Sequence, residues 1–342
     1  MPSFERESHR IVIAGASSLL GAELKSLLEE SKFADWDFRL VDEEVAAGML
    51  TEAGGEPAVI QPVEEGSFDR TRFIFFTGSA EFSRANLKSA ARTEASVIDL
   101  SGAALEDAED ARADETPVVA WFPKLGALRR ESSSVDGKLF AVPSAPATAT
   151  AAIALALSKL GLIRMSVVHY HPVSEAGRGG IEELEAQTGK LLSFQPFGQT
   201  VFDTQAAFNM LNRFGPASRQ RLDKVVQRIL AEVTACLSSK VALPALQVLH
   251  APVFYGATFS VSADVDVGST QPIEQVCKEG GLVIVPEDEA GPSNVSVAGE
   301  NSIFLAQPES DPSGTSSFWL WGAADNIRLP AWNAVKLAEM LF

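Results

Sequence analysis

Cysteine is scarce in this chain of 342 residues, which contains two, Cys236 and Cys277. Two cysteines cannot form the disulfide framework of a small secreted protein, and neither has a partner at metal-site spacing. We interpret both as small buried apolar residues. The chain also lacks any apolar run long enough to span a membrane, and its first residues, MPSFERESHR, lack the apolar core of a signal peptide. We therefore expect a cytoplasmic protein.

Basic residues are also few, because 28 Lys and Arg stand against 45 Asp and Glu, giving a formal net charge of −17. A surface this acidic repels polyanions, so we expect neither nucleic acid nor an anionic membrane as a partner. A small anion remains compatible, since a helix N-terminus supplies a local positive field. The length predicts two domains.

A glycine-containing turn lies near the N-terminus, within the segment His9–Leu28, which reads HRIVIAGASSLLGAELKSLL. A short apolar strand, a small-residue turn and an amphipathic helix are typical of a dinucleotide-binding βαβ unit, with serine in place of the middle glycine. In that interpretation the backbone amides of residues 16–20 face a pyrophosphate, and Ser18 can donate to it. A purely structural turn is the alternative. The candidate cofactor residues here are Gly15, Ala16, Ser17, Ser18, Leu19 and Gly21.

The second predicted strand, Trp36–Val41, ends in Asp42-Glu43-Glu44. An acid at this point accepts hydrogen bonds from the adenosine ribose and repels a 2′-phosphate, which favours NAD over NADP. Solvated loop acids are the alternative interpretation. Further strands and one helix alternate in the doubly wound pattern of a parallel sheet. We predict strands at Val59–Val63, Arg72–Phe76, Ala95–Leu100, Pro117–Phe122 and Leu139–Val142, and a helix from Glu81 to Arg92.

The stretch Phe140–Leu157 marks the change from this regular alternation to a mixed pattern. A strand end runs into a turn bracketed by Pro143 and Pro146, and Thr148 or Thr150 is the expected helix cap. Beyond it we predict further elements in the order strand, loop, helix, helix, strand, strand, strand and helix. They are Ile163–His171, the loop Val173–Gly180, Ile181–Thr188, Ser218–Leu237, Gln247–Phe254, Thr258–Asp266, Ser316–Ala323 and Asn333–Phe342.

Six blocks in order resemble the aspartate-semialdehyde dehydrogenase family over nearly the whole chain. They are IVIAGASSLLGAEL, VIDLSG, VSEAGRGGIEELEAQT, AFNML, APVFYG and ADNIRLPAWNAVKLAE. The resemblance implies an α/β fold, with a Rossmann-like doubly wound domain over 1–142 and a C-terminal α+β dimerisation domain over 143–325. It also implies that helix 326–342 returns to the first domain and that the protein is a homodimer.

The chain departs from the family at the positions that carry its chemistry. The resemblance implies a cysteine nucleophile where this chain has Ala145, and a histidine base where it has Ala257. Each chemical step needs a deprotonated nucleophile and a base within hydrogen-bond reach of it. Ser144 is the neighbouring hydroxyl, and a serine without a base is a poor nucleophile. Further substituted positions are His171 for a glutamine, His250 for the carboxylate-binding arginine, Leu105 near the phosphate arginine, and Arg221 as the expected counterpart of a substrate lysine.

The positions retained from the family are mostly those that face the dinucleotide. Besides the glycine turn they are Thr77, Gly78, Ser101, Ser174, Ala176 and Gly177. We therefore expect a protein with an NAD(P)-dependent oxidoreductase fold, of amino-acid biosynthesis by resemblance, that binds NAD or NADP, has no metal and lacks the usual activity. The alternatives are a non-catalytic binding or regulatory dimer whose ligand is unknown, and an enzyme of altered chemistry.

His169 and His171 lie two residues apart on one strand face and, with His250, form the cluster on which altered chemistry would depend. Two histidines so placed can begin a zinc site, whereas a hydrogen-bonded pair in the cleft is the commoner outcome. The strand aromatics Phe318, Trp319 and Trp321 are interpreted as core or dimer interface.

Overall fold

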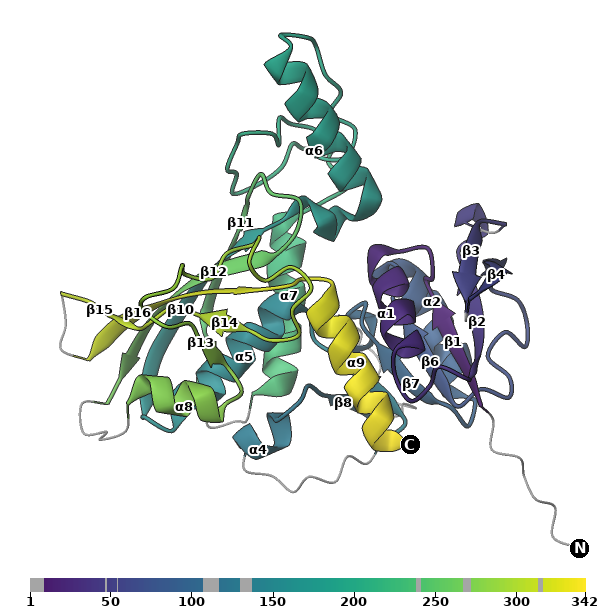
Figure 1. Ribbon diagram of the computed structural model, residues 1–342, viewed down its shortest axis with the longest axis horizontal. Coiled ribbons are helices and arrows are strands. Elements are labelled where there is room, and N and C mark those ends of the chain that lie inside the picture. The colour runs from purple at the N-terminus through teal and green to yellow at the C-terminus, as the bar shows by residue number, and fades with distance from the viewer. Residues whose placement is uncertain are drawn as a thin grey trace, which may run out of the picture. The chain divides into compact units, whose positions relative to one another are not determined.

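The computed structural model describes residues 9–46, 48–53, 55–106, 117–129, 137–237, 241–266, 272–312 and 316–342 (Figure 1). The chain forms two compact units. The first comprises the described parts of Met1–Pro123, Ser134–Pro143 and Pro330–Phe342, and the second those of Lys124–Ser133 and Ser144–Leu329. Among the described helices, none is long and apolar enough to cross a membrane.

The first unit is built on a parallel sheet of seven strands in the order β5-β2-β1-β6-β7-β9-β8. The crossovers that join parallel strands place helices on both faces, as in a Rossmann-like fold. The strands are β1 Arg10–Ala14, β2 Asp37–Asp42, β5 Gln61–Pro62, β6 Phe73–Phe76, β7 Ser96–Asp99, β8 Val118–Ala120 and β9 Leu139–Ala141. The helices are α1 Leu19–Glu29, η1 Glu44–Ala46, α2 Ala80–Ala91, α3 Ala103–Glu106 and most of α9 Arg328–Leu341.

Strand β1 shows why the sheet must be covered on both faces. Ile11 and Ile13 belong to one buried cluster, with residues of α1 and α9, while Val12 and Ala14 belong to another, with residues of α2. Because successive side chains of a strand point to opposite faces, an unbroken apolar run requires two covering layers.

The second unit contains a mixed sheet in the order β11-β10-β12-β16-β14-β13, with β15 paired to β16. Its strands are β10 Leu162–His171, β11 Ala245–His250, β12 Ala257–Val265, β13 Val283–Ile284, β14 Phe304–Leu305, β15 Glu309–Ser310 and β16 Ser317–Ala324. Its helices are α4 Leu125–Arg129, α5 Ala145–Ser158, η2 Val173–Ala176, α6 Gly177–Leu192, α7 Leu222–Cys236 and α8 Ile273–Glu279. Helix α5 is buried on nearly all sides, which its Ala-rich and Leu-rich sequence permits.

Several predicted elements differ from the structure in position. Helix α5 begins at Ala145 and not after Thr148 or Thr150, which are both buried inside it, because Pro146 occupies its first turn. The predicted loop Val173–Gly180 is wrong, since η2 and the first turn of α6 lie there. Helix α9 begins at Arg328, five residues before the start at Asn333 that the pattern predicts and two residues after the start of the helix 326–342 that the resemblance implies.

The strand predicted at Val59–Val63 is also replaced by two elements. The strand β4, Glu56–Val59, pairs with β3, Leu50–Ala53, in a separate hairpin, and β5 follows it. The Pro62 ring occupies the end of this edge strand, where a missing N–H is tolerated.

Candidate functional site

The glycine turn between β1 and α1 is packed too closely for a side chain. Gly15 has φ +94°, and a Cβ atom added to it would lie 2.1 Å from the amide nitrogen of Gly78. A Cβ on Gly21 would lie 2.5 Å from the Gly15 carbonyl oxygen. Both glycines are therefore required by backbone packing, and Gly78 is part of the same contact.

The amides of this turn are used differently from what the motif suggests. The amides of Gly15 and Ala16 both donate to the Val41 carbonyl, at 2.9 and 3.3 Å. The Ser17 amide donates to the Asp42 carboxylate at 2.7 Å. Strand β2 therefore holds the first half of the turn through hydrogen bonds, and those amides do not point to a ligand.

The hydroxyl of Ser18 is also committed inside the protein. It donates to the Thr77 carbonyl at 2.9 Å and accepts the Gly21 amide at 2.8 Å, which caps α1. In this structure the hydroxyl hydrogen of Ser18 is therefore used within the protein, and its donation to a phosphate stays a prediction. The amides of Leu19 and Leu20, in the first turn of α1, have no partner among the described residues. They are the donors that the turn leaves open to an anion.

Asp42 is buried, and its carboxylate also accepts the Glu43 amide at 2.8 Å. The interpretation as a solvated loop acid does not hold for Asp42, because this carboxylate anchors the turn. The neighbouring Glu43 accepts a hydrogen bond from Ser79 at 3.1 Å. The carboxylates of Asp42 and Glu43 therefore both lie at the carboxyl end of β2.

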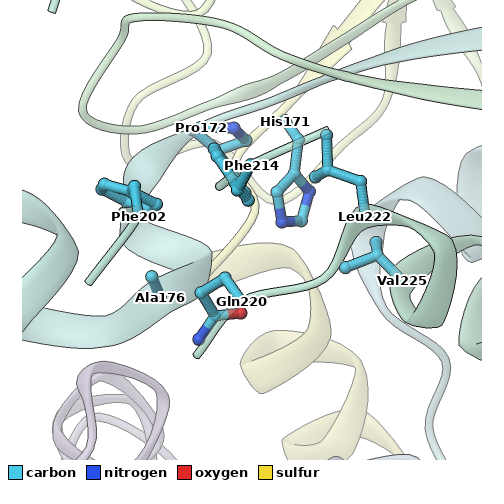
Figure 2. Close-up of a pocket in the computed structure, with 8 residues that line it drawn as sticks. All are labelled: His171, Pro172, Ala176, Phe202, Phe214, Gln220, Leu222 and Val225. Carbon is cyan, nitrogen blue, oxygen red and sulfur yellow. The ribbon is translucent and has the colours of Figure 1, made fainter. Parts of the chain in front are cut away.

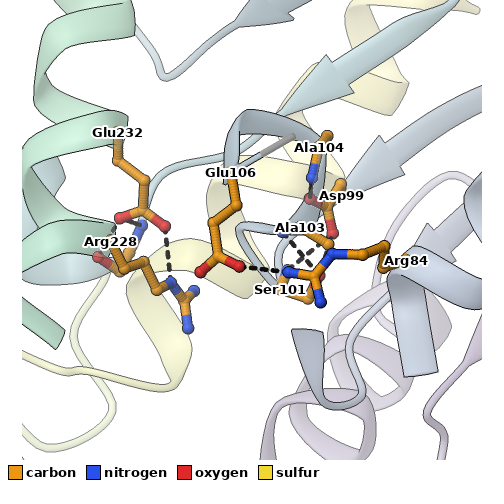
Figure 3. Close-up of polar contacts among 9 residues, drawn as sticks. Arg84, Asp99, Ser101, Ala103, Ala104, Glu106, Arg228 and Glu232 are labelled. Carbon is orange, nitrogen blue, oxygen red and sulfur yellow. Dashed lines mark hydrogen bonds and ion pairs between the residues drawn. The ribbon is translucent and has the colours of Figure 1, made fainter. Parts of the chain in front are cut away.

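Thr77 and Ser101, at the ends of β6 and β7, have structural roles. The Thr77 hydroxyl lies 3.0 Å from the Gly15 carbonyl oxygen, to which it donates. The amide and hydroxyl of Ser101 both donate to one oxygen of buried Asp99, at 2.9 and 2.6 Å (Figure 3). The other oxygen of Asp99 accepts the Ala104 amide at 2.8 Å. Three hydrogen bonds to Asp99 therefore hold the turn that carries Ser101.

In the second unit, Ser144 and Ala145 open helix α5, and the methyl group of Ala145 is buried. The Ser144 hydroxyl does not cap the helix but donates to the carboxylate of Glu232 on α7, which also accepts the Ser144 amide at 3.1 Å. Glu232 is 1% exposed, and its other oxygen accepts Arg228 Nε at 2.9 Å (Figure 3). Sequence reasoning missed Glu232 and Arg228, which are four residues apart on an amphipathic helix.

A hollow of about 100 Å³ lies beside this helix start. Its walls come from the start of α5, the end of β10, η2 and α7, and they are lined by Ser144, Pro146, His171, Glu175, Gln220, Val225, Arg228 and Ile229. An adjoining narrow pocket shares His171, Gln220 and Val225, and Figure 2 shows the imidazole entering it from β10.

The three buried histidines lie at the ends of neighbouring strands, with His171 of β10 in register with His250 of β11. The Thr150 hydroxyl donates to the Pro146 carbonyl at 2.8 Å, so at 2.9 Å it must accept from His169 Nε2. His250 Nε2 likewise donates to a carbonyl, that of Ala206, at 3.1 Å. The Nδ1 atom of each ring is buried and, within the described part of the chain, has no hydrogen-bond partner.

Burial is the main cause that lowers the pKa of each of these histidines. For His169 burial, with a smaller contribution from His171, lowers the pKa to about 3. For His171 the largest effect is burial, which lowers the pKa. The charge of Glu175 raises this pKa, and the charge of Arg228 lowers it. No cluster of three potential metal-binding side chains gathers within the described ranges.

Other positions singled out from the sequence lie as follows. Ala257 is the buried first residue of β12. Arg221 is an exposed residue before α7, paired with Asp223 at 2.7 Å, and does not line the hollow. The cation in the hollow is Arg228 instead, because the helix turns that residue inward. Leu105 lies in α3.

The retained residues of the second unit lie around η2. Ser174 is buried and hydrogen-bonded to Asn326, whose amide also donates to Glu175 at 2.9 Å. Ala176 and Gly177 join η2 to α6, and Gly177 has φ +71°. A glycine is favoured at this junction because other residues rarely adopt that backbone conformation.

Comparison with known proteins agrees with this architecture. The model described as "Semialdehyde dehydrogenase, NAD binding domain" matches residues 10–120, and "Semialdehyde dehydrogenase, dimerisation domain" matches residues 154–329. A "USG-1 protein homolog" from Azotobacter vinelandii is 29% identical over 339 residues, covering 97% of each chain. The "Aspartate-semialdehyde dehydrogenase 2" of Vibrio cholerae is 24% identical and covers 98% of each.

Solved structures show the same relationship. A probable aspartate-semialdehyde dehydrogenase from Pseudomonas aeruginosa superposes with a TM-score of 0.81 at 26% identity, covering 97% of this chain and 98% of that one. Aspartate semialdehyde dehydrogenase II from Vibrio cholerae gives 0.81 at 25% identity with the same coverage. This chain therefore belongs to the semialdehyde dehydrogenase family, with its NAD-binding domain and its dimerisation domain.

Proposed function

We propose that this protein is a homodimeric, dinucleotide-binding member of the family that does not perform cysteine-dependent semialdehyde chemistry. The observation that carries the proposal is the buried methyl group of Ala145 at the first position of α5. The chain has two cysteines, and burial raises the pKa of both Cys236 and Cys277 to about 12. Neither thiol supplies a thiolate at neutral pH.

Ser144 does not replace the missing thiolate in this proposal. Its hydroxyl is hydrogen-bonded to Glu232, and that carboxylate is already paired with Arg228. An arginine partner stabilises the charged form of a carboxylate, which weakens it as a base. Ala257 at the expected base position has no group that accepts a proton.

The dinucleotide assignment is supported by the open amides of Leu19 and Leu20 at the start of α1. When bound, the dinucleotide would accept or donate hydride, while the chain's own residues would hold its phosphates and ribose.

We further propose that the residues assigned to the cofactor act in two ways. Leu19 binds phosphate through its amide, while Gly15, Ala16, Ser17, Ser18, Gly21, Thr77, Gly78 and Ser101 shape the turns around it. Asp42 favours NAD over NADP, because a buried carboxylate beside the turn repels a 2′-phosphate. Ser174, Ala176 and Gly177 are proposed to lie on the nicotinamide side.

The proposed dimer uses the outer face of the sheet in the second unit. Trp319 and Trp321 alternate with buried residues on β16 and are 43% and 37% exposed. Tyr170 of β10 lies against Trp321 with ring centroids 5.8 Å apart. Exposed aromatic side chains on a sheet face are typical of an association surface.

Titration calorimetry with NAD, NADH, NADP and NADPH tests the first part of the proposal. Binding that is weaker for the two phosphorylated forms is expected, and an Asp42→Asn variant should narrow the difference. Equal binding of all four would contradict the role given to Asp42. Absence of binding by any of them would contradict the retained cofactor site.

Activity assays test the second part, with aspartate semialdehyde, phosphate and either oxidised dinucleotide. No turnover is expected from the natural chain or from Ala145→Cys, since the base position remains Ala257. Phosphate-dependent turnover by the natural chain would refute the proposal. Turnover by Ala145→Cys alone would show that the base is supplied from elsewhere.

A further inference from the structure

The chain between α6 and α7 contains an irregular segment, residues 200–215, whose residues form neither a helix nor a strand. Its first half is held from α6, where the side chains of Glu183 and Gln187 accept its backbone amides. Among the described residues, these contacts with α6 side chains end at Ala207. The second half of the segment therefore depends on another anchor.

His250, the last residue of β11, supplies that anchor. Its backbone forms an antiparallel bridge with Leu211, in which the His250 amide donates to the Leu211 carbonyl at 2.8 Å and the Leu211 amide donates back at 3.4 Å. Its imidazole donates from Nε2 to the Ala206 carbonyl at 3.1 Å. One residue of the sheet therefore holds the segment at two points.

The imidazole of His250 also packs against two phenylalanines of the same segment. Its ring centroid lies 5.9 Å from that of Phe202 and 5.3 Å from that of Phe214, and the two phenyl rings are 4.8 Å apart. His250 is 0% exposed. Phe202 and Phe214 also line the narrow pocket that the His171 ring enters (Figure 2). The attachment of the segment to β11 therefore keeps two walls of this pocket in place.

This environment accommodates only the neutral form of His250. A carbonyl oxygen cannot donate, so Nε2 carries the hydrogen and Nδ1 is the unprotonated nitrogen. Nδ1 is buried and has no hydrogen-bond partner in the part of the chain that the structure describes. A proton added there would place a charge and an unsatisfied donor inside the ring cluster, and both are costly. If the segment were detached, water would hydrate the protonated ring and remove that cost.

The elements packed around the ring do not offer a counter-charge. Their charged or titratable side chains near this cluster are His171, Glu183, Asp203, Arg213, Arg228 and Glu232. Glu183 accepts amides of the segment, and Glu232 accepts Arg228 Nε at 2.9 Å. Asp203 accepts the Ala217 amide at 2.8 Å. Among the described residues, no carboxylate forms a hydrogen bond with the imidazole.

The pKa of His250 agrees with this geometry. Burial is the largest effect and lowers the pKa from the ordinary value of 6.5. The hydrogen bond to the Ala206 carbonyl raises this pKa, and the charge of His171 lowers it. A hydrated imidazole in the detached segment would regain the ordinary pKa. The detached form therefore binds more protons than the attached form once the pH falls below about 6.5.

We propose that His250 is a pH-sensitive fastener that attaches residues 200–215 to the sheet of the second unit. At neutral pH the uncharged ring holds the segment through Ala206, and the backbone bridge holds it through Leu211. On acidification the ring takes up a proton, and the equilibrium shifts toward a form in which the segment has left β11. In that form the narrow pocket loses the walls formed by Phe202 and Phe214. The device does not depend on the dinucleotide.

Hydrogen exchange of the full chain, followed by mass spectrometry at pH 7.5 and 5.5, tests the proposal. Rates are divided into the intrinsic exchange rates at each pH to give protection factors. Protection of peptides covering residues 208–215 should fall about tenfold at the lower pH, because the detached form binds one additional proton. It should also be lower than that of α5 at both pH values, since the segment opens by itself. Unchanged protection at pH 5.5, or protection equal to that of α5, would overturn the proposal.

Two variants and a matched control assign the effect to one side chain. His250→Gln keeps a donor for the Ala206 carbonyl but cannot titrate, so protection at pH 7.5 should stay within about threefold and should not fall at pH 5.5. His250→Leu removes the donor as well, and protection should be about tenfold lower at pH 7.5 with no further fall. If His250→Leu does not fold, His250→Gln alone decides.

The control is His169→Asn, because His169 is a second buried histidine whose pKa burial lowers to about 3, but its Nε2 partner is Thr150 on α5. Local opening of the segment leaves that residue buried, so the tenfold fall should remain in this variant. A fall of the same size in His250→Gln would refute the role of His250. Loss of the fall in His169→Asn would show that the exchange reports unfolding of the whole protein, which would also refute the proposal.

Discussion

The segment that follows α6 should lose its structure when Glu183 is replaced by alanine. One oxygen of this buried carboxylate accepts the amides of Thr200 and Val201 at 2.7 and 2.6 Å and the Thr200 hydroxyl at 2.9 Å. The other lies 3.3 Å from the Phe202 amide. Gln187, one turn later, accepts two further amides of the segment. Two side chains of one helix therefore bind much of this irregular segment.

The magnitude follows from which donors water could satisfy after the change. Hydrogen bonds to a charged group contribute about 1.5–3 kcal/mol each, but such values do not add. Thr200 is exposed, so its groups would bind water, whereas Val201 is half-buried and Phe202 is buried. Gln187 loses its 3.2 Å hydrogen bond to Glu183 but keeps its contacts with the segment, so we expect a loss of about 3 kcal/mol in the free energy of local opening.

Hydrogen exchange followed by mass spectrometry measures this local free energy directly. Peptides covering residues 198–207 should exchange more than about 100-fold faster in Glu183→Ala, since about 1.4 kcal/mol corresponds to a factor of ten. Glu185→Ala is the control, because Glu185 is an exposed glutamate on the same helix. Exchange rates in Glu183→Ala within about threefold of the natural protein would refute the reasoning.

Three further predictions concern buried groups and the outer sheet face. Because burial lowers the pKa of His169 to about 3, the folded protein binds fewer protons there than the unfolded chain. The free energy of unfolding should therefore fall as the pH decreases from about 6.5 toward 3. Between pH 7 and 5, the midpoint of urea unfolding should fall less in His169→Asn than in the natural protein. Cys236 and Cys277 should react negligibly with a thiol reagent at pH 8 and both react in urea, because burial raises the pKa of each to about 12. Rapid reaction of either thiol in the native protein would contradict this burial. Trp319→Glu combined with Trp321→Glu should shift the protein from dimer to monomer in sedimentation velocity, and an unchanged dimer would exclude this face as the interface.

The fold class could be predicted from the sequence because local patterns of apolar residues indicate it. Unbroken apolar runs such as Ile11–Ala14 predict a strand buried on both faces, and the structure places helices on both sides of that strand. The blocks that resemble the family were confirmed by matches to both of its domains. The assignment of individual cofactor residues stays a prediction.

Element boundaries near prolines and glycines were less well predicted. A glycine-rich run at residues 177–180 was interpreted as a loop, yet Gly177 begins α6. Tertiary contacts override local preference there, since a Cβ on Gly180 would lie 2.4 Å from the Val173 carbonyl oxygen. The glycines allow close packing between η2 and α6, which no local pattern reveals.

The sequence by itself determined the family, the two types of sheet and the missing side chains at positions 145 and 257. Only the tertiary structure decided which groups surround those positions. Glu232 and Arg228 reach the start of α5 from a helix more than eighty residues later in the chain, with Ser144 and Glu232 separated by 88 positions. The burial of His171 depends on the segments that pack around it, and the Ser18 hydroxyl donates to the Thr77 carbonyl across 59 positions. Periodicity and motifs report neighbours along the chain, whereas the environment of a buried polar group depends on segments that folding brings together.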